Sequence, residues 1–161
     1  MAALVDTNVL VYAYDPGSPA KQRIAEELLA AGILDGSLVL SHQALVEFVA
    51  ATSRPRPAAG ESPGRPLLSP VQASRAVETF LVAFPILYPS EEVVRTALRG
   101  AAGYGLSWYD AHLWAYAEVF GLPEILSEDF EHGRFYGAVR TIDPFQGAET
   151  VHEPPARYDR R

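Results

Sequence analysis

Short apolar runs alternate along this chain with longer segments in which apolar residues recur at helical spacing. An apolar run of three to five residues that is bounded by polar or turn-forming residues is typical of a buried strand. We therefore predict strands at residues 2–5, 37–40, 86–88, 124–126 and 138–142.

Helices are predicted between these strands. A short helix or turn is expected at residues 9–14, and longer helices at 18–31, 42–53, 69–84, 90–102 and 107–120. Ser18 before Pro19 is a typical helix start, and the glycines at 32, 103, 105 and 121 are interpreted as helix ends. The alternation predicts an α/β domain with three layers (α/β/α) and a mainly parallel central sheet of about five strands.

Two segments depart from this pattern. Residues 54–70 hold five prolines and two glycines in 17 positions, which indicates a loop or an insertion. Residues 146–161 form a polar tail that contains prolines and is expected to be loosely packed. Residues 1–145 are expected to form a single domain that carries this insertion.

The composition argues against several classes of protein function for this chain. The 161 residues carry a net charge of −7, whereas a simple duplex-DNA binder usually has a basic face. The lack of cysteine excludes disulfides and thiolate chemistry and agrees with a cytoplasmic location. No apolar run approaches the roughly 18–20 residues of a membrane helix, so no membrane partner is expected. The phosphate-binding and dinucleotide-binding glycine motifs are also absent.

Two acidic residues lie in predicted helices that are otherwise largely apolar. Glu47 is the only residue charged at neutral pH between Asp35 and Arg54. Asp110 shares a helical face with apolar residues such as Leu113. An acid on a core-facing stripe is costly unless it is paired or bound to a metal ion, so both residues are candidates for a functional site.

Two further acids, Asp6 and Asp129, follow predicted strands. The carboxyl ends of parallel strands are where open α/β sheets bind ligands. Acids gathered there would repel, by about 4 kcal/mol for two charges about 4 Å apart at an effective dielectric near 20. The single lysine, Lys21, lies in another region of the sequence. A divalent cation such as Mg²⁺ or Mn²⁺ is the natural compensation, and such sites mostly serve phosphoryl transfer to water.

Three of the four acids also have a specific structural interpretation. Asp6 has the position of a helix N-cap, Asp110 that of a first-turn acid favoured by the helix dipole, and Asp129 that of a turn residue. Asp15 and Asp143 precede prolines and are interpreted as turn residues only. His112 and the aromatic residues around it are assigned to packing rather than to ligand binding.

Four segments, taken in order, resemble the motifs of the PIN-domain family, and within it the VapC-like toxins of toxin–antitoxin pairs. The segments are 5–10, 45–48, 106–111 and 126–130, the last followed by a glycine at 133 and a closing strand ending at 142–145. The resemblance implies a PIN fold and a metal-dependent endoribonuclease that uses one or two Mg²⁺ or Mn²⁺ ions. It also implies a cognate antitoxin protein that blocks the crevice, and a homodimer.

The same resemblance assigns residues to the site. The acidic metal site would consist of Asp6, Glu47, Asp110 and Asp129, one from each motif. Asn8 and Ser127 carry over as polar groups beside it.

The insertion at residues 54–70 has no counterpart in the compact members of that family. It carries three arginines, Arg54, Arg56 and Arg65, against a single acid, Glu61. We expect these arginines to contact RNA phosphates or a partner protein, with a solvated insertion as the alternative.

Two other functions remain open from the sequence. Acid-rich Mg²⁺ sites at strand ends also serve small-molecule phosphohydrolases, although their usual nucleophile motif has a second aspartate where this chain has Asn8. A non-catalytic PIN-like binding module is the other alternative, but loss of an acid would be typical of it and all four are present.

Overall fold

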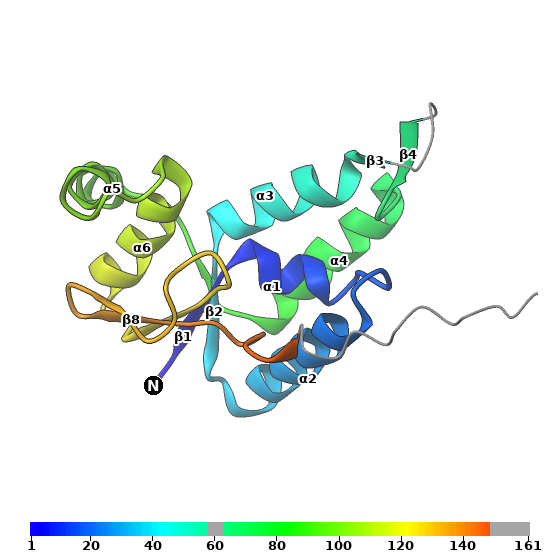
Figure 1. Ribbon diagram of the computed structural model, residues 1–161, viewed down its shortest axis with the longest axis horizontal. Helices are drawn as coiled ribbons and strands as arrows, with labels where there is room; N and C mark the ends of the chain where they lie inside the picture. Colours follow the sequence, from blue (N-terminus) through cyan, green and yellow to red (C-terminus); the bar gives the residue numbers. More distant parts are fainter. Residues whose placement is uncertain (58–62, 149–161) are drawn as a thin grey trace, which may run out of the picture.

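A computed structural model describes residues 1–57 and 63–148 of the chain, and a six-stranded sheet lies at its centre (Figure 1). The strands, in spatial order, are β5 (Ile86–Leu87), β2 (Leu38–Ser41), β1 (Ala3–Val5), β6 (Glu124–Leu126), β8 (Val139–Ile142) and β7 (Phe135–Tyr136). All neighbours pair in parallel except β7, which is antiparallel to β8. The predicted α/β class with a mainly parallel sheet is confirmed, with one short strand more than expected.

Helices cover both faces of the sheet. They are α1 (Thr7–Tyr12), α2 (Pro19–Asp35), α3 (His42–Ser53), α4 (Pro70–Ala83), α5 (Glu91–Tyr104) and α6 (Trp108–Phe120). In β1, Val5 packs on the side of α1–α4 and Leu4 on the side of α5 and α6, because successive strand residues point to opposite faces. The two helix groups stand apart on either side of the sheet in Figure 1, as the three-layer prediction required.

Helix α2 is longer than predicted. It runs through Gly32 and ends at Gly36, which has a left-handed backbone with a φ of 67°. Gly32 is buried, and a Cβ there would lie only 2.2 Å from Cδ1 of Leu38. Its interpretation as a helix end was therefore wrong: Gly32 lets α2 approach β2 closely. Ser18 precedes the helix as predicted, but its side chain makes no capping hydrogen bond.

The proline-rich insertion is not simply a loop. Residues Pro55–Pro57 (β3) and Pro63–Pro66 (β4) pair as an antiparallel hairpin, because proline favours extended backbone and is tolerated in a ribbon with free edges. The hairpin is fixed to α3 where the amide of Leu68 donates to the carbonyl of Thr52 at 3.0 Å.

The C-terminal tail is described only as far as residue 148. Ala148 packs against the core on the side of α1 and α2, and residues 149–161 lie outside the described part of the chain, as do 58–62. The loosely packed tail therefore stays a prediction. Within the described residues, no helix combines the length and apolarity needed to cross a bilayer.

Candidate active site

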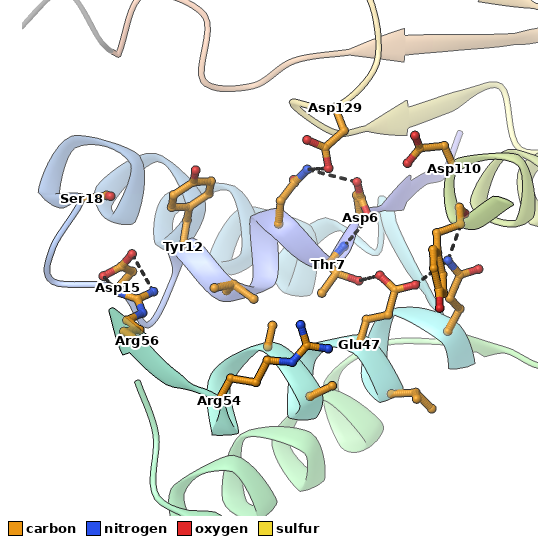
Figure 2. A pocket seen from close by; sticks show the side chains of 17 residues that line it. Asp6, Thr7, Tyr12, Asp15, Ser18, Glu47, Arg54, Arg56, Asp110 and Asp129 are labelled. Atoms are coloured by element: carbon orange, nitrogen blue, oxygen red, sulfur yellow. Dashed lines mark hydrogen bonds and ion pairs between the residues drawn. The ribbon is translucent and has the colours of Figure 1, made fainter. Parts of the chain in front are cut away.

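A cavity of about 820 Å³ opens at the carboxyl end of the central strands, between α1, α3 and the start of α6 (Figure 2). It is lined by all four acids predicted from the sequence: Asp6, Glu47, Asp110 and Asp129. They come from the end of β1, the middle of α3, the first turn of α6 and the loop after β6. The topology therefore gathers acids that are up to 123 positions apart in the sequence, as the strand-end argument predicted.

Asp6 is the most deeply buried of the four acids, with 8% of its surface exposed. It caps α1, where its Oδ1 accepts from the amide of Thr7 at 2.6 Å. The N-cap role is thus real, but Asp6 also lines the cavity. The pKa of Asp6 is raised to about 7, mainly by burial and to a smaller extent by the nearby carboxylates of Asp129 and Glu47, whereas the hydrogen bonds from Ser127 and Thr7 lower it.

Asn8 and Ser127 hold Asp6 and Asp129 together. The Ser127 hydroxyl donates to Oδ2 of Asp6 at 2.6 Å and accepts from the amide of Asp129 at 3.1 Å. The Asn8 Nδ2 lies 3.0 Å from Oδ2 of Asp6, 3.2 Å from Oδ2 of Asp129 and 3.2 Å from the Ser127 hydroxyl. The structure thus brings both polar residues beside the acids, and Ser127 is fully buried.

Glu47 is oriented by residues that the sequence analysis did not single out. Its Oε2 accepts from the Thr7 hydroxyl at 3.3 Å, and its Oε1 accepts from Nε2 of Gln43 at 2.7 Å. The same Gln43 amide donates to the carbonyl of Tyr109 at 3.0 Å, which ties α3 to the start of α6. Gln43 lies one helical turn before Glu47, and that spacing is the signal that could have identified it.

Asp110 lies half-buried in the first turn of α6, where its amide donates to the Ser107 hydroxyl at 3.2 Å. Burial raises the pKa of Asp110, a hydrogen bond between its side chain and that of Ser107 lowers it, and the charge of Asp129 raises it again. Among the described residues, neither Asp6 nor Asp110 pairs with a cation. The site therefore holds more negative charge than its own side chains compensate.

The donor chemistry of this site suits a hard divalent cation. Besides the carboxylates, Oδ1 of Asn8 and Oε1 of Gln43 are buried and have no hydrogen-bond partner among the described residues. No three Asp, Glu or His side chains of the described chain stand close enough to ligate one ion together. A Mg²⁺ ion does not need such a group, because it keeps several of its waters and is usually held by one or two carboxylates. The residues present therefore fit Mg²⁺ or Mn²⁺.

Two of the three arginines of the insertion lie at the opposite end of the cavity. Asp15 is buried and receives two hydrogen bonds from Arg56, of 2.9 and 3.0 Å, which lower the pKa of Asp15. Asp15 also accepts from the amide of Gly17, which confirms its predicted role in a turn. Its ion pair with Arg56 was not predicted. Arg54 lines the cavity as well, whereas Arg65 is exposed on β4 and is not among the lining residues.

Lys21 lies nearer to the acids than its place in the sequence indicated. Its Nζ donates to Oε2 of Glu128 at 2.6 Å and to the Tyr12 hydroxyl at 3.2 Å. The Tyr12 hydroxyl in turn donates to Oε1 of Glu128 at 2.6 Å. Lys21 is far from this loop in the sequence, but α2 places it beside the loop that carries Asp129. Its ion pair within residues 1–57 and 63–148 is with Glu128, and there none of the four acids of the cavity is paired with it.

Comparison with known proteins agrees with this geometry. The model of the PIN domain family matches residues 3–138. A toxin–antitoxin complex from Klebsiella pneumoniae contains a similar fold, with a TM-score of 0.61 at 20% identity over 89% of this chain and 98% of that one. VapBC2 from Rickettsia felis, solved bound to a fragment of promoter DNA, gives a TM-score of 0.61 at 13% identity, over 88% and 97% of the two chains.

VapC20 from Mycobacterium tuberculosis, a toxin that cleaves the sarcin–ricin loop, gives a TM-score of 0.60 at 18% identity, over 86% of this chain and 99% of that one. At these identities the likeness shows the fold. No curated protein matches the sequence.

Proposed function

This chain belongs to the PIN domain family, and from that premise we propose that it is a metal-dependent endoribonuclease, the toxin of a toxin–antitoxin pair. The observation that supports this proposal most directly is the convergence of Asp6, Glu47, Asp110 and Asp129 on one open cavity. Carboxylates in such numbers at a strand edge serve the hydrolysis of phosphate esters when a divalent ion is present. A non-catalytic module would have no need to keep all four.

In this proposal, one or two Mg²⁺ or Mn²⁺ ions would bind among the four acids, each ion contacting one or two carboxylates and keeping several of its waters. The metal would supply charge stabilisation at the phosphate and an activated water. The remaining work belongs to the protein. Asn8 and Ser127 fix the carboxylates of Asp6 and Asp129, and Gln43 and Thr7 fix Glu47. Because these hydrogen bonds exist before substrate arrives, little reorganisation is needed during the reaction.

The shape of the cavity favours a polymer over a small phosphate ester. The cavity is open, and it continues from the acids past α1 to the hairpin of the insertion (Figure 2). A site for a small metabolite usually encloses most of its ligand. A strand of RNA, in contrast, can lie along such a cavity with one phosphodiester at the acids.

The test is cleavage of total cellular RNA by the purified protein, with and without Mg²⁺ or Mn²⁺, beside an Asp110→Asn variant. We expect metal-dependent fragments from the parent protein and a rate below about one-hundredth of the parent rate from the variant, since even residues behind a metal ligand are worth 10- to 100-fold. Asp110 is partly exposed, so the variant should fold normally, which circular dichroism checks.

Glu118→Gln provides the matched control. It removes one negative charge from the exposed side of the same helix, α6, and Glu118 does not line the cavity. The control should cut RNA like the parent. An active Asp110→Asn protein would refute the assignment of Asp110, and release of phosphate from p-nitrophenyl phosphate without any RNA cleavage would favour a small-molecule phosphohydrolase.

Two partners belong to the same proposal. We propose a cognate antitoxin that covers the cavity, which the toxin–antitoxin complexes of similar fold support, and a homodimer. Light scattering of the purified protein tests the second statement, and a monomer at micromolar concentration would contradict it. The protein would act in the cytoplasm, where its RNA substrate is found.

A further inference from the structure

The charged groups along the cavity are unevenly paired. Asp15 and Arg56 compensate each other through two hydrogen bonds at one end. Apart from that pair, the charged groups among the described lining residues are four carboxylates and one guanidinium, that of Arg54, which points into the cavity (Figure 2). In residues 1–57 and 63–148, no carboxylate forms an ion pair with Arg54.

The backbone at Arg54 is held on both sides. Arg54 is the C-cap of α3, with extended dihedral angles (φ −74°, ψ 138°), because the residue before Pro55 is disfavoured in the helical region. On the helix side, the carbonyl of Thr52 accepts from the amide of Leu68 at 3.0 Å. On the hairpin side, Arg56 is fixed to Asp15. The backbone at Arg54 is therefore fixed before any ligand binds.

Arg54 and Glu47 lie on one face of α3, seven residues and thus two turns apart. Seven residues correspond to about 10 Å along a helix axis. Ala50 and Ala51, which also line the cavity, lie between them on the same face. Their small side chains leave an unobstructed floor from the acids to the guanidinium.

We propose that Arg54 binds a backbone phosphate of the RNA strand, on one side of the scissile bond. This inference rests on the proposed ribonuclease activity and adds a subsite to it. A guanidinium presents its donors in a fixed fork that matches two phosphate oxygens. With about 3.4 Å per nucleotide of a stacked strand, the phosphate at Arg54 belongs to a nucleotide about three positions from the bond that is cut.

An anionic polymer explains the layout better than a single carboxylate of a protein partner would. Repeated negative charges need compensation at more than one place, and the cavity offers it at the cation-binding acids and again at Arg54. Arg56 is already engaged by Asp15, and Arg65 lies outside the cavity. Of the three arginines in the insertion, Arg54 is thus the one placed for this contact.

The experiment measures binding of a fluorescein-labelled 12-nucleotide oligouridylate to the Asp110→Asn protein, by anisotropy across a NaCl series at fixed Mg²⁺. Each phosphate contact with a single strand contributes about 0.7 to the slope of log K against log salt. We expect Arg54→Gln to reduce the slope by about 0.7 and to weaken binding about fivefold at the lowest salt.

Arg65→Gln is the matched control, because it removes the same charge from the same insertion outside the cavity, and its slope should equal that of the parent. Arg54→Lys keeps the charge but not the fork, so it should restore the slope and recover only part of the affinity. Arg54 is exposed, so all three variants should melt at the temperature of the parent.

The outcomes separate this inference from the proposed function. An unchanged slope in Arg54→Gln, an equal loss in Arg65→Gln, or no binding by the Asp110→Asn protein would overturn the phosphate subsite. If the protein that retains Asp110 cuts RNA, the ribonuclease assignment survives that result. If instead the slope falls as expected but that protein cuts no RNA, the subsite stands and the proposed catalytic activity fails.

Discussion

The buried acids of this protein differ in what compensates their charge. Asp15 meets Arg56, which lies 41 positions later in the sequence, and its pKa is lowered. Asp6 meets hydroxyl, amide and backbone donors but no cation among the described residues, and burial raises its pKa to about 7. Strongly shifted acids without a structural counter-ion are typical of functional sites, whereas paired acids are typical of structural ones.

The Asp15–Arg56 pair yields a prediction about stability and pH. Arg56→Gln should lower the free energy of unfolding by about 1–2 kcal/mol at pH 7, between the values for exposed and buried ion pairs, because Asp15 is buried and Arg56 is partly exposed. Since the folded-state pKa of Asp15 is depressed, this stabilisation is present above the unfolded pKa of about 3.8 and is lost as the pH falls below it. Urea denaturation of both proteins between pH 3 and pH 8 measures the difference.

The control for this prediction is Arg65→Gln, which removes an exposed arginine of the same hairpin and should change stability by less than about 0.5 kcal/mol. A parent-to-variant difference for Arg56→Gln that stays constant down to pH 3 would show that the effect does not come from the carboxylate of Asp15.

How far the sequence predicts individual residues depends on where their partners lie. Glu47 stood out because a charge in an apolar helix needs an explanation, and the structure places it in the cavity. Its partner Gln43 did not stand out, because an uncharged polar residue near a helix start is ordinary. The contact between Lys21 and Glu128 was not predicted, because the two residues are 107 positions apart and no local pattern reports such a contact.

Glycines illustrate the same limit for secondary-structure elements. Gly36, Gly105 and Gly121 have positive φ and end α2, α5 and α6. Gly32 and Gly103 lie inside helices, although a glycine in a sequence looks the same in both settings. Whether a glycine ends a helix or lies within it depends on the element that packs beside it, and the local sequence does not reveal that element.

Gly32 and Gly103 therefore form a matched pair of substitutions. Gly32→Ala should destabilise the protein by about 1–3 kcal/mol, because the new Cβ would lie 2.2–3.0 Å from three side-chain atoms of the buried Leu38. Gly103→Ala has nothing within 4 Å and lies in a helix, so it should stabilise by up to about 1 kcal/mol. Thermal unfolding of both variants beside the parent gives the two signs, and a stabilising Gly32→Ala would contradict the close packing of α2 on β2.

The elements that the sequence did not predict are short strands, although the equally short β5 was predicted. β7 has two residues and pairs only with β8, and the hairpin of β3 and β4 is built largely from prolines, which argue against a strand in the sequence. Long periodic helices such as α3 and α6 were predicted to the exact residue or within one. A longer helix repeats the apolar period more often, so the period is easier to recognise in the sequence.

At the scale of the whole molecule, the order of the strands creates the site. β1 lies between β2 and β6, so Asp6 after β1 and Ser127 after β6 are neighbours, and the amide of Asp6 donates to the carbonyl of Leu126 at 3.0 Å. The helices that follow β2 and precede β6 bring Glu47 and Asp110 to the same edge. This convergence concentrates negative charge, and therefore electrostatic repulsion, at one edge of a molecule that already has a net charge of −7.

A divalent ion should therefore stabilise the folded protein as a whole. An ion that binds the folded state alone adds RT ln(1 + [L]/Kd) to its stability, about 1.4 kcal/mol at ten times Kd, or roughly 3–6 °C in melting temperature for a domain of this size. We expect Mg²⁺ and Mn²⁺ to raise the melting temperature of the parent by this amount at pH 8, and EDTA to reverse the effect. Differential scanning fluorimetry across a metal titration measures it.

Two variants decide whether the stabilisation comes from the cavity. Asp6→Asn removes the charge of the most buried acid of the four. In EDTA no metal ion compensates the charge of Asp6, which then destabilises the folded parent, so the variant should have the higher melting temperature. The melting temperature of the variant should change little when metal is added. Asp143→Asn changes an acid that lies outside the cavity and that, in the part of the chain the structure describes, accepts only from the amide of Phe145. This variant should respond like the parent. Equal metal responses in all three proteins would mean that the ions act on the general negative charge of the molecule, and the convergence of the four acids would then need another explanation than a cation.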